Sequence, residues 1–94
     1  MTTQTPKATA EIFTLVRDCI AERKCEKLLG CKVHDNDIGY CVTIKALGHP
    51  LGVTYMFVIS YFMWERSVNP KASLQWKLDI AFNELTKYMS EWKQ

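Results

Sequence analysis

The chain has 94 residues, of which 48% are hydrophobic and 23% are charged, a composition that can fill one modest core and is too apolar for a disordered chain. Its 12 Lys and Arg and 10 Asp and Glu give a net charge of +2, with both signs mixed along the chain, so composition alone gives nucleic-acid binding little support. We expect a single domain over residues 1–94, with a flexible tail at residues 1–5.

The first residues, MTTQTPKATAEIF, lack the apolar stretch of a secretory signal peptide. The four cysteines are therefore expected to be thiols in a reducing compartment. The longest apolar run, residues 53–64, is shorter than the roughly 18 residues that a membrane-spanning helix needs. The sequence predicts a cytoplasmic protein with no membrane partner.

The first predicted element is a helix with Thr5 as its N-cap and Pro6 as its first helical residue, and Thr9 is an alternative N-cap. From Ile12 to Ile20 the apolar residues recur at helical spacing. Beyond Ile20 this pattern is lost, so the helix either bends there or gives way to a new segment. Gly30 is the predicted C-cap region.

Two or three antiparallel strands are predicted next. Residues 31–35 are a candidate edge strand, and residues 38–47 alternate cleanly between apolar and polar types. Two glycines and a proline in residues 48–52 predict a turn, which makes a hairpin with the following run. That run, residues 53–64, is rich in β-branched and aromatic residues and is predicted to be the central strand, although an unbroken apolar run also fits a buried helix. Tyr55, Phe57 and Ile59 are taken as its inward residues, and the opposite assignment of the two faces is the alternative.

Asn69 and Pro70 predict the start of the last helix, as N-cap and first helical residue. Apolar residues then follow one helical stripe from Leu74 to Trp92. Residues 74–80 also alternate with period two, which leaves a strand as the alternative for that stretch. The predicted fold class is α+β, with two layers: helix, antiparallel sheet of two or three strands, and helix, both helices packed on one sheet face.

The cysteines do not form the closely spaced pairs that structural zinc sites use, so they are interpreted as buried or incidental thiols, and no metal is predicted. A thiol nucleophile or redox centre built from Cys31, Cys41 and His34 is the third functional alternative, but no third group that would orient a base is evident. Phosphate-binding loops and hydrolase motifs are absent from the sequence. We expect no enzyme activity and no cofactor.

The order of elements resembles that of double-stranded RNA-binding domains, and Gly48-His49-Pro50 resembles the loop between their first two strands. Those domains carry a lysine cluster at the start of the last helix, whereas this chain has Pro70-Lys71-Ala72-Ser73. The resemblance implies the alternative function, nucleic-acid binding through a basic patch. The residues of that patch would be Arg17, Arg23, Lys24, Lys27, Lys32 and Lys45.

The leading hypothesis is a protein-binding function, and it is based on apolar side chains that lie away from the predicted core. Trp76 and Ile80 lie opposite the core stripe of the last helix, and the outward residues of the predicted central strand include Met56, Phe62 and Trp64. Either other parts of the chain cover these residues, or they form an interface with a protein partner or a second copy. The predicted function is a non-enzymatic protein-binding module, an inhibitor or adaptor on a larger cytosolic assembly, or a homodimer. This profile is similar to that of small phage-encoded inhibitors such as anti-CRISPR proteins.

Overall fold

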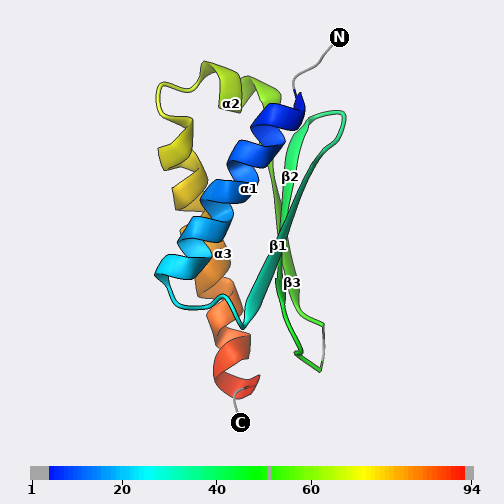
Figure 1. Cartoon of the computed structure of the whole chain (residues 1–94), viewed down its shortest axis with the longest axis vertical. Helices are drawn as coiled ribbons and strands as arrows, with labels where there is room; N and C mark the ends of the chain where they lie inside the picture. The colour runs from blue at the N-terminus through cyan, green and yellow to red at the C-terminus, as the bar shows by residue number, and fades with distance from the viewer. Residues whose placement is uncertain (1–4, 51, 93–94) are drawn as a thin grey trace.

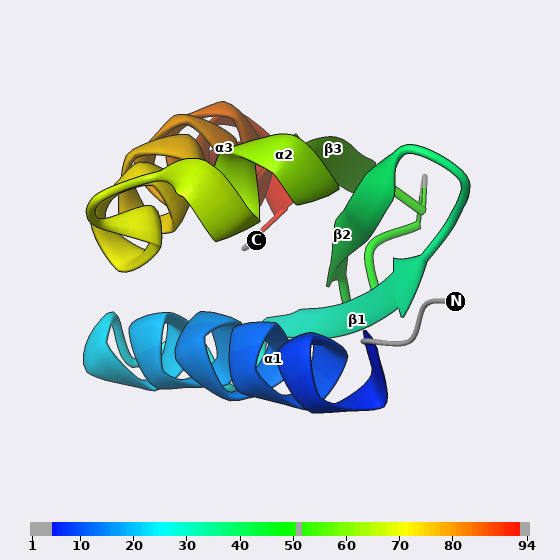
Figure 2. The same ribbon diagram turned by 90° about the horizontal axis from the view of Figure 1, so that it is seen from above.

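The structure is a computed structural model that describes residues 5–50 and 52–92. Its elements are α1 (Thr5–Glu22), β1 (Leu29–Asp35), β2 (Gly39–Ala46), β3 (Thr54–Ser60), α2 (Tyr61–Arg66) and α3 (Pro70–Trp92). The strands form one antiparallel sheet in the order β1-β2-β3, and α1 and α3 lie side by side on one of its faces (Figures 1 and 2). The predicted α+β fold class is confirmed.

The core lies between the sheet and the two long helices. β2 is the middle strand, and its register places Val42 opposite Val33 of β1 and Phe57 of β3, so these three side chains share the inner face. The predicted inward orientation of Tyr55, Phe57 and Ile59 is confirmed by this register. The largest fully buried side chains come from α1, β2 and α3: Tyr40, Ile12, Ile20, Ile44, Leu74, Leu78, Leu85, Val16 and Val42.

α1 ends at Glu22, whereas the sequence predicted its C-cap region at Gly30. That prediction is wrong, because Gly30 lies in β1. The N–H of Lys24 donates to the Ala21 carbonyl at 2.9 Å, and the N–H of Cys25 donates to the Ile20 carbonyl at 3.1 Å. Lys24 has φ = 57°, so a lysine takes the left-handed position that glycine usually occupies at such helix ends. The loss of the apolar stripe after Ile20 thus marks the end of the helix rather than a bend.

The prediction of a central strand over residues 53–64 is wrong in position and in length, because β2 is the middle strand and β3 is an edge strand of the sheet. β3 ends at Ser60, whose hydroxyl accepts the Met63 N–H at 3.1 Å and caps the short helix α2. Phe62 and Trp64 therefore lie in α2 and not on the outer face of the sheet, which corrects that part of the prediction. The sequence pattern could not locate this change, because an apolar run on both faces fits a strand and a buried helix alike.

α3 begins as predicted, since the Asn69 side-chain oxygen accepts the Ala72 N–H at 3.2 Å and Pro70 is the first helical residue. Residues 74–80 are helical, so the strand alternative is wrong. At the other end of the chain, Met1–Gln4 lie outside the described residues, whereas Thr5 already belongs to α1 rather than to a tail.

Candidate interaction surfaces

The sheet has helices on one face only, and its other face is open. We call the open face the outer sheet face. Its side chains follow from the register of the three strands: Lys32, His34, Cys41, Thr43, Lys45, Thr54, Met56 and Val58. Met56 is 62% exposed, and Val58 beside it is 38% exposed, so the β3 side of the outer sheet face is apolar.

The β1 and β2 side of the same face holds a shallow depression of about 420 Å³. Lys32 lies opposite Thr43, and Lys45 lies opposite Gly30. A Cβ atom added to Gly30 would meet the side chain of Leu47 at 3.1 Å. The lining contains two lysines and no carboxylate, so the depression is suited to an anionic group.

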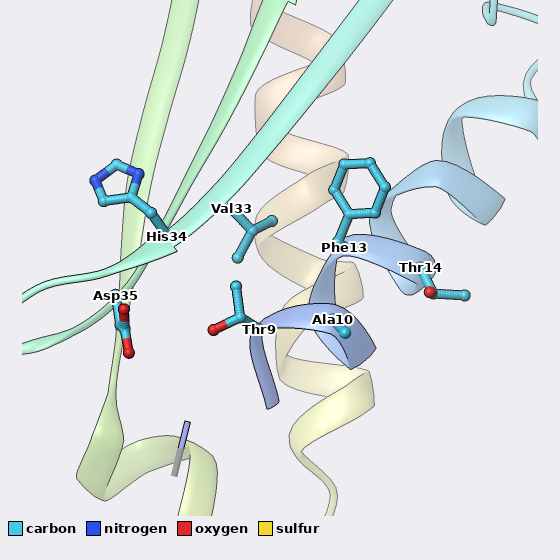
Figure 3. A pocket seen from close by; sticks show the side chains of 7 residues that line it. All are labelled: Thr9, Ala10, Phe13, Thr14, Val33, His34 and Asp35. Carbon is cyan, nitrogen blue, oxygen red and sulfur yellow. The ribbon is translucent and has the colours of Figure 1, made fainter. Parts of the chain in front are cut away.

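A second concave site lies between the N-terminal half of α1 and the outer edge of β1, with a volume of about 510 Å³ (Figure 3). Phe13 and Ala10 line it from α1, and Val33 lines it from β1. Figure 3 shows the Phe13 ring and the Val33 side chain on the two sides of this groove. Phe13 is 37% exposed, with the Arg17 guanidinium 5.8 Å from its ring centre, so the groove has an apolar wall with a cation beside it.

The cysteine and histidine residues named in the sequence lie on both faces of the sheet. Cys41 is buried and lies directly opposite His34 across the β1–β2 pair, while Cys31 lies on the inner face of the sheet. Burial raises the pKa of the Cys31 thiol, and the nearby Arg17 offsets this only in part. A raised pKa favours the unreactive thiol over the thiolate. Among the described residues, no group of three or more His, Cys, Asp and Glu side chains is placed to hold a metal ion.

The structure does not bring the predicted interface residues together. Trp76 (65% exposed) and Ile80 (38%) lie on the outer side of α3, and Met56 lies on the outer sheet face. Phe62 is 67% exposed on α2 with the Arg66 guanidinium over its ring. Trp64 is half-buried, packs against the core and makes an edge-to-face contact with the buried Tyr40 at 6.4 Å. The five residues therefore occupy three separate surfaces.

The predicted basic patch is also divided. Arg23 pairs with Asp79 of α3 and stacks over Phe82, with 4.3 Å between its guanidinium carbon and the ring centre, so its charge is used within the fold. Arg17 lies beside the groove, and Lys24 and Lys27 lie in the exposed connection after α1. Only Lys32 and Lys45, the last two members, share a site, which is the depression on the outer sheet face.

Gly48-His49-Pro50 lies between β2 and β3, not between the first two strands, so its resemblance to the RNA-binding loop is not supported by position. His49 instead contacts Tyr88 near the end of α3, with 6.4 Å between the ring centres. The groove beside β1 was missed in the sequence. Its lining residues come from two consecutive elements, and only the packing of α1 against β1 forms the groove.

A scan against protein families, a search of curated proteins and a search of solved structures found no match to this chain. Within the described residues, no helix is both long enough and apolar enough to pass through a membrane.

Proposed function

We propose that the chain is a non-enzymatic, cytoplasmic protein-binding module that docks as an inhibitor or adaptor on a larger assembly through its outer sheet face. One observation carries the proposal: the sheet is covered by helices on one face, and the other face exposes Met56 and Val58 on the edge strand β3. Apolar side chains of this kind gain free energy when a partner removes them from water.

The charges of the outer sheet face indicate the chemistry of the partner. Lys32 and Lys45 lie beside the apolar part, and neither forms an ion pair with another residue that the structure describes. Protein interfaces combine an apolar centre with a polar rim, and complementary rim charges accelerate association. The expected partner surface is apolar where it meets Met56 and acidic where it meets the two lysines.

A pair of charge substitutions tests the outer sheet face. Met56→Asp introduces a charge there, and Phe62→Asp introduces the same charge on α2, where the side chain is equally exposed. Proteins captured by the immobilised chain should be retained by Phe62→Asp and lost by Met56→Asp, with a binding loss of about 2 kcal/mol or more. Circular dichroism of both variants verifies that they are folded.

Two outcomes would contradict this assignment. Capture that survives Met56→Asp would remove the outer sheet face from the interface, and capture lost only in Phe62→Asp would move the interface to α2. Sedimentation of the isolated chain distinguishes a second copy of the chain from a different partner protein. A dimer that dissociates in Met56→Asp would identify the partner as a second copy of the chain.

Nucleic-acid binding is the second candidate, and the lysine pair in the depression is the observation that favours it. If the depression binds phosphates, affinity for duplex RNA should fall as salt rises, and the salt slope should decrease by about 1 for each lysine lost. We would compare the double variant Lys32→Gln, Lys45→Gln with Lys71→Gln, Lys87→Gln, which removes the same charge from α3. Equal slopes for the two double variants would reject the depression as a phosphate site.

A further inference from the structure

β1 forms one edge of the sheet, and the hydrogen bonds at its two ends reveal which of its backbone groups point outward. Before the strand, the Leu47 N–H donates to the Leu28 carbonyl at 2.8 Å; after it, the Asn36 N–H donates to the Gly39 carbonyl at 2.9 Å. Facing residues of an antiparallel pair alternate between bonded and non-bonded pairs. The even-numbered residues of β1 therefore bond to β2, and the odd-numbered residues direct their N–H and C=O groups away from the sheet.

The outward backbone groups in the second half of β1 are available to another strand. The Leu29 N–H is used within the fold, since it donates to the Cys25 carbonyl at 2.8 Å. For Cys31, Val33 and Asp35, the structure gives no backbone partner on this side among the residues that it describes. The strand contains no proline, and its register with β2 is continuous, so neither a proline nor a bulge blocks strand addition at this edge.

The groove described above lies directly beside this edge. Val33 belongs both to the outward set of the backbone and to the lining of the groove, with Ala10 and Phe13 on the opposite wall (Figure 3). In a strand paired with β1, the residues opposite Val33 and Cys31 would place their side chains on the inner face of the sheet. Apolar side chains at those positions would enter the groove between β1 and α1.

The other side chains of an added strand would lie on the outer sheet face, next to Lys32 and His34. A second copy of the chain fits this position poorly. Pairing centred on Val33, which uses the groove in both copies, places Lys32 opposite His34 of the second copy, so the lysine meets no acidic side chain there. An acidic residue opposite Lys32 is favourable instead.

We infer that the β1 edge binds an extended segment of a partner protein as a fourth strand, with apolar residues turned into the groove and acidic residues turned toward Lys32 and His34. This inference rests on the proposed protein-binding function and specifies a mode of recognition for it. Backbone hydrogen bonds would supply the alignment, and the groove and the two basic side chains would supply the preference for an alternating apolar and acidic sequence.

A synthetic peptide of alternating valine and glutamate, capped at both ends, is the probe, and its valine–lysine counterpart is the charge control. Amide hydrogen exchange of the chain is measured with and without peptide. At a valine–glutamate concentration of about ten times its Kd, exchange of the Cys31 and Val33 amides should slow by about tenfold, because these amides exchange only from the unbound form. The lysine peptide should give much weaker protection.

The other sheet edge provides an internal comparison. The Ala46 N–H donates to the Val53 carbonyl at 2.9 Å, so the same alternation turns the backbone groups of Thr54, Met56 and Val58 outward on β3. These amides should remain unaffected by the peptide. Protection of the β3 amides in place of those of β1, equal protection by both peptides, or no protection at either edge would each overturn the inference.

Two proline variants test the backbone alignment. Val33→Pro removes an outward N–H and should fold but lose peptide binding, whereas Lys32→Pro removes a bond to β2 and should be the more destabilised variant. Ala10→Trp fills the groove from the exposed side of α1, and it tests the groove if Val33→Pro does not fold. Its control is Ala21→Trp, because Ala21 is also exposed on α1 but lies away from the groove. Peptide binding retained in Ala10→Trp would refute the groove as the binding site.

The peptide assay tests strand addition at β1, and the capture assay tests docking through the outer sheet face, so either proposal can be rejected without the other. If the peptide does not bind but Met56→Asp abolishes partner capture, the outer sheet face remains the interface and strand addition is rejected. If the peptide protects β1 but capture depends on neither site, the strand site exists and the proposed docking function is wrong.

Discussion

Trp76 and Leu78 are two positions apart in α3, yet Trp76 is 65% exposed and Leu78 only 1%. The helical turn of about 100° per residue separates them onto opposite sides of the helix. Exposure of an indole ring of this size is compatible with a binding role, but Ile80 is the only other predicted interface residue on this side of α3. Trp76 is therefore a secondary candidate beside the outer sheet face.

We predict that Trp76→Ala changes the free energy of unfolding by about 0.5 kcal/mol or less, as is usual for exposed positions. Leu78→Ala, the matched core substitution, should cost about 2–5 kcal/mol because it leaves a cavity. Urea denaturation of both variants measures the difference. If Trp76→Ala also weakens a partner complex, the outer side of α3 contributes to the interface; a destabilisation as large as that of Leu78→Ala would show that Trp76 is part of the core.

At the scale of elements, the chain between Val53 and Pro70 changes direction twice with the help of small polar caps. Ser60 ends β3 and starts α2, and Asn69 starts α3. The Tyr61 N–H also donates to the Ile38 carbonyl at 3.1 Å, which ties the start of α2 to the β1–β2 turn. α2 itself has no buried residue among its six, so its position depends on these attachments and on the half-buried Tyr61 and Trp64.

We predict that Asn69→Ala destabilises the fold by about 1 kcal/mol, because the first turn of α3 loses the side-chain acceptor for the Ala72 N–H. Asn83→Ala, in the middle of the same helix, is the control; its exposed side chain is replaced by a better helix former, so stability should stay equal or rise slightly. Thermal and urea unfolding of both variants compares them. Equal losses in the two variants would show that the cap does not stabilise α3.

At the scale of the whole molecule, burial couples the thiols to folding. Burial raises the pKa of Cys19, with a smaller contribution from the Glu22 carboxylate, and burial likewise raises the pKa of Cys31 above the ordinary value of 9.0. The folded state thus holds these protons more tightly than the unfolded chain does. As pH rises through the ordinary thiol range, the unfolded chain releases its protons first, and this favours unfolding.

We predict that the free energy of unfolding is nearly constant around neutral pH and decreases from about pH 9 upward. Urea denaturation at a series of pH values under reducing conditions measures this dependence. Cys31→Val removes one titrating thiol and keeps an apolar side chain, so its decline should be shallower than that of the unmodified chain. Stability that increases over the same alkaline range would contradict the assignment of these two thiols as protonated in the folded state.

Local signals in the sequence were sufficient for much of the architecture. Asn69-Pro70 defined the start of α3, and the clean alternation around Val42 defined β2. Period two also separated the side chains of β3 into two sets, but only the packing decided that the set with Phe57 faces inward. These predictions succeeded because caps and periodicities depend on neighbouring residues only. The end of β3 was misplaced because Ser60 lies inside an apolar run, where the sequence carries no change of period.

The candidate sites were decided by tertiary structure. The sequence by itself determined which residues are exposed on α3 and which types of side chain are in surplus, because helical periodicity assigns faces without knowledge of the partner elements. It could not determine that Lys32 and Lys45 share a depression, that Arg23 is paired with Asp79, or that an open groove lies between α1 and β1. These arrangements depend on strand register and on the packing of elements distant in sequence, and register is fixed only when one face of the sheet is buried against the helices.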